Sequence, residues 1–120
     1  MIRSLKREEM PSLYNRADAF VMTSIQEGQP VSAMEASCCG LPIFSTRCGG
    51  VEDYIGQLEG RIYELTDYKA FANGLKEFLE NKISFDSEHI RNNCVDRFGK
   101  KAFVNNFCNF LNEIDNQEKQ

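Results

Sequence analysis

The sequence lacks the features that mark membrane spans, nucleic-acid-binding surfaces and metal centres. No apolar run reaches the roughly 18 residues that a membrane-spanning helix needs. The formal net charge is −4 and the pI is about 5.0, so the chain has no excess of basic residues with which to bind nucleic acid. The single histidine, His89, lies at no metal-ligand spacing from a cysteine, and we expect it to be a solvated residue at a helix start.

The sequence also shows no secretory signal at its first residues and no recognisable cysteine framework. The five cysteines are an odd number at irregular spacing, which favours a reducing compartment. We therefore expect a cytoplasmic protein, and peripheral attachment to the inner membrane face stays open. Cys38 and Cys39 are adjacent on a predicted helix, and we interpret them as small core residues rather than ligands or nucleophiles.

A chain of 120 residues makes one domain, which can bury roughly two-thirds of the surface that the unfolded chain exposes. Its patterns predict strands at residues 19–23, 42–45 and 60–65, helices at 6–16, 30–39, 51–55 and 68–81, and two more helices after Phe85. This alternation predicts an α/β fold in which a partial Rossmann-like parallel sheet is flanked by helices. A sheet of about three strands has an open edge, which favours pairing with another chain.

A turn that opens a helix follows the first predicted strand, at the carboxyl end where open α/β sheets bind ligands. Gly28 permits the tight turn, and Pro30 suits the first position of a helix because it has no N–H to leave unpaired. The N–H groups of Gln29, Val31 and Ser32 then point outward at the positive end of the helix dipole. Such a helix end can bind a phosphate group.

Two glutamates flank this turn, Glu27 before it and Glu35 on the helix. Glu35 shares a face of the predicted helix with Val31, Met34 and Cys38, which favours its burial. No Lys or Arg occurs between Arg16 and Arg47, so neither carboxylate has a helix-spaced cation partner. Both are predicted to accept hydrogen bonds from the hydroxyls of a ligand. The structural alternative is a solvated loop residue at 27 and a glutamate at the helix rim at 35.

Five separated motifs occur in the order and spacing of a known family. They are Ala17-Asp18-Ala19-Phe20-Val21-Met22-Thr23-Ser24, Glu27-Gly28, Glu35-Ala36, Gly40-Leu41-Pro42-Ile43 and Gly49-Gly50-Val51-Glu52-Asp53. Together they resemble the C-terminal nucleotide-sugar-binding domain of retaining glycosyltransferases of the GT-B fold, the large family four, or group 1 glycosyl transferases. The resemblance continues through Gly60-Arg61-Ile62-Tyr63 and, more weakly, towards the C-terminus.

The resemblance implies a role for each residue that matches the family motif. Glu27 would be the catalytic residue that contacts the donor sugar, and Glu35 would hold the ribose hydroxyls. The other implied donor-binding residues are Gly28, Gln29, Pro30, Val31, Ser24, Gly49 and Gly50. For Ser24 and the two glycines an ordinary turn role stays open as well.

The implied function is transfer of a sugar from a nucleotide-sugar donor, such as a UDP- or GDP-sugar, in polysaccharide or glycolipid biosynthesis. In this family the transfer retains the anomeric configuration and needs no metal or other cofactor. The alternative is a non-catalytic nucleotide-sugar-binding or interaction module, either a subunit of a split enzyme or a truncated remnant. The implied partners are the donor and a separate acceptor-binding chain or a second copy. A generic receiver-type α/β domain is disfavoured, because its acidic cluster is not found at the strand ends.

The sequence departs from the family pattern in what precedes the first motif. The acceptor-binding domain and the first strands of the donor domain, which carry a basic pair, have no counterpart, and Arg47 is the nearest candidate cation. We expect residues 1–115 to form a partial donor-binding domain and residues 116–120 a disordered tail. The last predicted helix carries an apolar stripe, Phe103, Phe107, Phe110, Leu111 and Ile114, which either closes this domain's core or packs on another domain.

Overall fold

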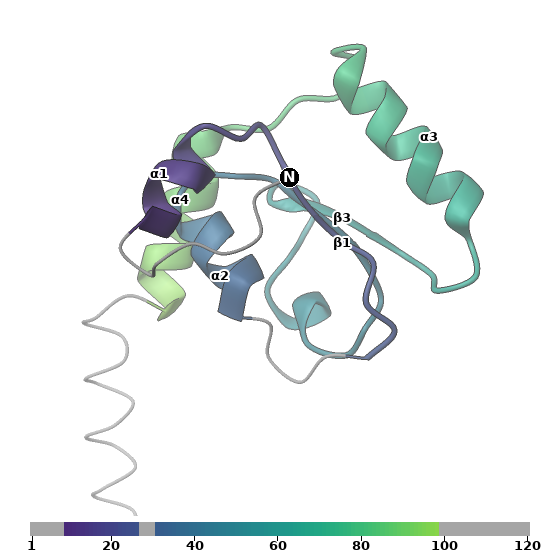
Figure 1. Cartoon of the computed structure of the whole chain (residues 1–120), viewed down its shortest axis with the longest axis horizontal. Helices are drawn as coiled ribbons and strands as arrows, with labels where there is room; N and C mark the ends of the chain where they lie inside the picture. Colours follow the sequence, from purple (N-terminus) through teal and green to yellow (C-terminus); the bar gives the residue numbers. More distant parts are fainter. Residues whose placement is uncertain (1–8, 27–30, 99–120) are drawn as a thin grey trace, which may run out of the picture.

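The computed structural model describes residues 9–26 and 31–98, and these form a three-layer α/β arrangement (Figure 1). The elements in chain order are α1 (Met10–Asn15), β1 (Phe20–Met22), α2 (Val31–Cys38), β2 (Ile43–Thr46), the 3₁₀ helix η2 (Val51–Asp53), β3 (Gly60–Tyr63), α3 (Tyr68–Leu79) and α4 (Ser87–Phe98). The strands pair in parallel in the order β1-β2-β3. The predicted fold class is therefore confirmed.

Strand β2 is the centre of the sheet and all four of its residues are buried. Successive side chains of a strand point to opposite faces, so Ile43 and Phe44 serve two different layers. Ile43 belongs to a core cluster with Ala33 and Ala36 of α2. Phe44 contacts Phe78, with ring centroids 5.4 Å apart, at the end of α3. Helices α2 and α3 therefore cover opposite faces of the sheet, and α4 packs beside α2 (Figure 1).

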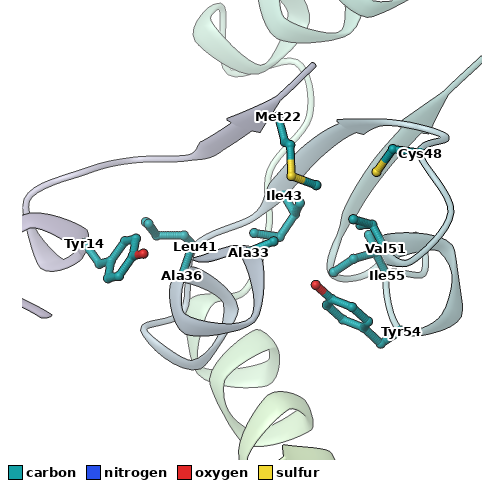
Figure 2. Close-up of a cluster of buried hydrophobic side chains, with 10 residues drawn as sticks. All are labelled: Tyr14, Met22, Ala33, Ala36, Leu41, Ile43, Cys48, Val51, Tyr54 and Ile55. Atoms are coloured by element: carbon teal, nitrogen blue, oxygen red, sulfur yellow. The ribbon is translucent and has the colours of Figure 1, made fainter. Parts of the chain in front are cut away.

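Helix α2 lies close to the sheet because it presents small residues to it. Its buried residues are Ala33, Ala36 and Ser37, and Figure 2 shows the two alanines among the larger core side chains. We expected the buried face to carry Val31, Met34, Glu35 and Cys38, and this is wrong: Val31 is exposed and the other three are half-buried. A helical wheel gives the angles between side chains but not the direction in which the sheet lies.

The end of α2 forms as the sequence predicts. Gly40 has φ 86°, its N–H donates to the Ser37 carbonyl at 2.9 Å, and the Leu41 N–H donates to the Ala36 carbonyl at 3.1 Å. This pair of bonds is a Schellman motif, which needs a left-handed residue that is usually glycine. A Cβ at position 40 would also lie 2.9 Å from the Ser87 carbonyl oxygen, so α4 can start close to this turn only because the residue is glycine.

Other element boundaries differ from the prediction by a few residues. Helix α3 ends at Leu79, because Asn81 takes a left-handed conformation with φ 59°. The segment predicted as a helix at 51–55 is a single 3₁₀ turn, η2. Within the described residues α1 begins at Met10 with Pro11 in its first turn, where the missing N–H leaves no hydrogen bond unmade. The second helix after Phe85, with its apolar stripe at 103–114, and the boundary at 115 lie outside the described residues.

Cys38 of α2 is bonded to Cys94 of α4 in a disulfide that spans 56 residues of sequence. Cys38 is half-buried and bonded, so its interpretation as a small core residue is wrong, whereas Cys39 and Cys48 are free thiols. The pairing arises because α4 packs across α2 and brings the two Cα atoms to 5.1 Å, within the usual range for a disulfide. We expected a reducing compartment because the cysteines showed no pairing pattern. This disulfide argues against that premise.

A second link between distant segments is a polar cluster around Glu59, which is almost fully buried. Its Oε1 lies 3.2 Å from His89 Nε2 and accepts a hydrogen bond from Asn93 at 3.2 Å, both on α4. Its Oε2 accepts a hydrogen bond from the Gly56 N–H at 2.9 Å. The expectation of a solvated His89 is only partly correct, because its side chain is 44% exposed and yet contacts Glu59.

Among the described residues no helix combines the length and the apolar character that crossing a bilayer requires.

Candidate functional site

The three strands end at one edge of the sheet, and the described candidates Ser24, Gly49 and Gly50 follow the ends of β1 and β2 there. Ser24 follows β1, and its carbonyl oxygen accepts a hydrogen bond from the Thr46 hydroxyl at 2.5 Å. This bond joins the segment after β1 to the end of β2. Helix α2 begins at the same edge, because it connects β1 to a parallel neighbour. Four of the predicted residues, Glu27, Gly28, Gln29 and Pro30, lie outside the described residues.

Glu35 is half-buried on α2 and is bound by a tyrosine from α1. The Tyr14 hydroxyl lies 3.2 Å from Glu35 Oε2 and 3.3 Å from the Ser32 carbonyl oxygen, and its one proton can be donated to either acceptor. No spacing rule predicts this contact, because the two partners are 21 residues apart in sequence. We expected no helix-spaced cation partner for Glu35, and none of the ion pairs among the described residues includes it; its partner there is a neutral tyrosine hydroxyl. A carboxylate has about four lone-pair sites, so this one can still accept further hydrogen bonds.

Tyr14 itself is held firmly in the core. Its side chain is 6% exposed and lies beside Leu41 and Ala36, as Figure 2 shows. Burial, together with the hydrogen bond to Glu35 and the negative charge of that carboxylate, raises the pKa of Tyr14 from 10.0 to about 12. Tyr14 is thus a protonated hydrogen-bond donor throughout the physiological pH range. The polar end of a core residue faces the half-buried carboxylate.

The glycine pair after β2 forms a turn that a nearby carboxylate holds. Gly49 has φ 109°, a conformation that favours glycine, and its N–H lies 3.2 Å from each carboxylate oxygen of Glu52 in η2. Gly50 is buried and precedes η2. The structural role of the pair is therefore clear, and the donor-binding role of Gly49 and Gly50 stays a prediction.

Arg47 is the cation that follows β2, and it is paired. Its Nε lies 2.8 Å from Glu64 Oε1, and its backbone N–H donates to the Tyr63 carbonyl at 2.8 Å. Both side chains of the ion pair are more than half exposed, so the pair is worth at most about 1 kcal/mol. Such a weak partner leaves Arg47 available to an anion at this edge.

The sheet face opposite α2 has an open apolar hollow of about 370 Å³ at this edge. Its wall includes Val21 of β1, Leu65 after β3, and Tyr68, Phe71 and Leu75 of α3. Glu35 and Tyr14 are not part of it, because they lie on the α2 side of the sheet. Within the described ranges 9–26 and 31–98, no three His, Cys, Asp or Glu side chains gather where they could hold a metal ion.

The family model and the similar proteins are all glycosyltransferases. The profile of the family described as "Glycosyl transferases group 1" matches residues 1–97. The chain is 30% identical over 94 residues to the UDP-Gal:alpha-D-GlcNAc-diphosphoundecaprenol alpha-1,3-galactosyltransferase of Escherichia coli, a match that covers 77% of this chain and 24% of that protein. It is 32% identical over 75 residues to the D-inositol 3-phosphate glycosyltransferase of Corynebacterium urealyticum, covering 62% of this chain and 18% of that one.

A solved structure agrees with these relatives in fold. The apo form of the lipopolysaccharide outer core galactosyltransferase WaaB superposes with a TM-score of 0.78 at 23% identity, over 89% of this chain and 31% of that chain. The structure thus matches one part of a larger GT-B architecture. The chain spans about a quarter of the length of the curated relatives it matches, or less.

Proposed function

Because the chain belongs to the group 1 glycosyl transferase family, we propose that it is the donor-binding part of an enzyme that transfers a sugar from a nucleotide-sugar donor in glycolipid or polysaccharide biosynthesis. The donor class is a UDP- or GDP-sugar. The E. coli relative is named for UDP-Gal and for a diphosphoundecaprenol-linked acceptor, which supports a lipid-linked product and a place at the inner membrane face.

The observation that carries the proposal is the placement of Glu35. Its carboxylate is half-buried, lies one turn into α2, and is held by Tyr14 rather than by a cation. A carboxylate that is not neutralised by Lys or Arg keeps its acceptor capacity for hydroxyl groups. The first turn of α2 begins at the carboxyl edge of the sheet, where its N–H groups suit a diphosphate. The two features together match a nucleoside diphosphate, with the ribose hydroxyls towards Glu35.

The proposed chemistry is electrostatic and needs no protein nucleophile and no metal. The α2 N-terminus, from Val31 on, and Arg47 would stabilise the charge on the departing nucleoside diphosphate. Glu27 would orient the donor sugar. Gly28 and Gln29 would supply N–H groups to the phosphates, and Pro30, which has no N–H, would start the helix. Ser24, Gly49 and Gly50 would line the donor at the same edge. Transfer with retention then depends on positioning and charge stabilisation.

An alternative to sugar transfer is a binding or interaction module. A glycosyltransferase also needs an acceptor site and a closed cleft that excludes water. In this alternative the chain binds the nucleotide sugar without transferring it, or completes a site together with a separate acceptor-binding chain or a second copy.

Calorimetric titration of the purified chain with UDP, GDP and their sugar conjugates tests the proposal. We expect one nucleotide to bind, and Glu35→Ala to weaken its binding about tenfold or more, since hydrogen bonds to a charged acceptor are lost. The matched control is Glu80→Ala, which removes an exposed carboxylate at the far end of α3 and should leave affinity unchanged. A folded chain that binds no nucleotide would contradict the proposal.

A further inference from the structure

Tyr14 connects three parts of the molecule that are distant in sequence. It lies in α1, its ring belongs to the core below α2, and its hydroxyl reaches both Glu35 and the Ser32 carbonyl oxygen. Its ring also lies near Phe20 of β1, with centroids 6.4 Å apart. The position of the hydroxyl is therefore fixed by packing on several sides, not by the hydrogen bonds alone.

Glu35 depends on such a partner more than a typical surface glutamate does. A free glutamate side chain samples several rotamers, and ordering it costs entropy at the moment a ligand binds. Among the described residues no ion pair includes Glu35, and its carboxylate accepts one hydrogen bond, from Tyr14 to Oε2. The second oxygen, Oε1, has no partner within that part of the chain.

We propose that Tyr14 is a positioning residue of the donor site: by donating to Glu35 Oε2 it orients the carboxylate so that Oε1 accepts the ribose hydroxyls of a bound nucleoside diphosphate. The inference deepens the proposed function and rests on it. The same hydroxyl also contacts the Ser32 carbonyl oxygen in the first turn of α2, so the carboxylate and the helix end are held in one geometry. Tyr14 acts through Glu35 and does not itself touch the nucleotide.

Removal of the hydroxyl alone is a clean perturbation. Tyr14→Phe keeps the ring that packs on Leu41 and Phe20, so the core is preserved. Tyr63→Phe is the matched control, because it removes a partly buried hydroxyl whose pKa is also raised by burial. The Tyr63 ring packs on Phe71 of α3, with centroids 4.9 Å apart, on the sheet face opposite α2.

The test is a binding cycle measured by calorimetry on the full chain with the nucleoside diphosphate that binds, UDP or GDP. Tyr14→Phe should weaken binding about threefold to tenfold, and Tyr63→Phe should not change it. In a Glu35→Ala background the loss of the Tyr14 hydroxyl should have no further effect, since its target is gone. Additive losses, or an unchanged affinity in Tyr14→Phe, would overturn the positioning role.

The 2′,3′-dideoxy analogue of the same nucleoside diphosphate separates positioning from a general loss of structure. It lacks the hydroxyls that Glu35 is proposed to bind, so Tyr14→Phe should bind it as tightly as the unmodified chain does. An equal loss for both ligands would show that Tyr14 supports the fold only, which contradicts the inference. If the unmodified chain binds neither UDP nor GDP, the proposed function itself fails, an outcome distinct from a chain that binds but ignores Tyr14→Phe.

Discussion

The disulfide between Cys38 and Cys94 ties α2, the helix that carries Glu35, to α4. The two helices also pack against each other over much of their length (Figure 1). The bond closes a long loop that contains β2, β3 and α3. It therefore restricts the unfolded chain strongly, and it ties α2 to α4 as the Tyr14 hydrogen bond ties α2 to α1.

Loss of this bond should cost stability. Closing a loop of 56 residues lowers the entropy of the unfolded chain. The free energy of unfolding of the oxidised chain should therefore exceed that of the Cys38→Ser/Cys94→Ser double variant by about 4 kcal/mol. Urea unfolding with and without a thiol reductant measures the difference. The reduced chain and the double variant should then unfold at similar urea concentrations. Equal midpoints for the oxidised and reduced chains would contradict the prediction.

The same bond bears on where the protein works. A cytoplasmic location stays a proposal, and a stable disulfide is uncommon in a reducing compartment. Alkylation of thiols immediately on cell lysis, followed by mass measurement, shows whether Cys38 and Cys94 are oxidised in the cell. Five alkylated cysteines would favour the cytoplasm, and three would argue against it.

Stability should fall at alkaline pH because burial raises the pKa of Tyr14, Tyr54 and Tyr63, most strongly for the first two. Burial is the main cause that raises the pKa of Tyr14 and the pKa of Tyr54 from 10.0 to about 12. The unfolded chain therefore loses these protons near pH 10, whereas the folded chain keeps them. The contribution of these tyrosines to the free energy of unfolding is therefore complete below pH 10 and declines as the pH rises from 10 to 12.

Urea midpoints measured at pH 8, 10 and 11.5 would follow this decline. Tyr14→Phe removes one of the three groups, so its midpoint should fall less steeply across the same interval. Tyr68→Phe is the control, since Tyr68 is 74% exposed. If the urea midpoint of Tyr14→Phe falls with pH as steeply as that of the unmodified chain, Tyr14 does not contribute to the alkaline loss of stability.

Local chemistry explains which parts of the fold could be predicted. The Gly40-Leu41-Pro42 segment predicted the end of α2 within one residue, because a left-handed turn and a proline leave few alternatives. The strands were predicted from short apolar runs, and their buried centre, Ile43–Thr46, differs from the prediction by one residue at each end. Boundaries were less accurate where packing rather than a cap ends the element, as in the single turn at Val51–Asp53.

Contacts between distant segments could not be predicted from the sequence. Tyr14 and Glu35 meet because α1 packs against α2, and no spacing rule connects residues 21 apart. Cys38 and Cys94 meet because α4 lies across α2. The family motifs nevertheless identified Glu35 as a candidate. The expected burial of Glu35 on an apolar helix face was wrong, because that face is only half-buried or exposed.

Glu59 should be important for attaching α4. Its carboxylate accepts hydrogen bonds from Asn93 and the Gly56 N–H and contacts His89, so its replacement leaves several donors in a nearly dry site. We expect Glu59→Ala to lower the free energy of unfolding by about 1–3 kcal/mol. Asp96→Ala, which removes an exposed carboxylate of α4, should change it by less than about 0.5 kcal/mol. Equal effects of the two variants on urea unfolding would count against this role.

The central claim is that a nucleoside diphosphate binds at the carboxyl edge of the sheet, against α2. Amide chemical shifts of the isotope-labelled chain, recorded during titration with UDP and then GDP, test it most directly. We expect changes at Ser24, Ser32 and Glu35, with none at Leu79 and Asn81 near the opposite end of α3. A folded chain whose shifts do not move, or move only away from this edge, would contradict it.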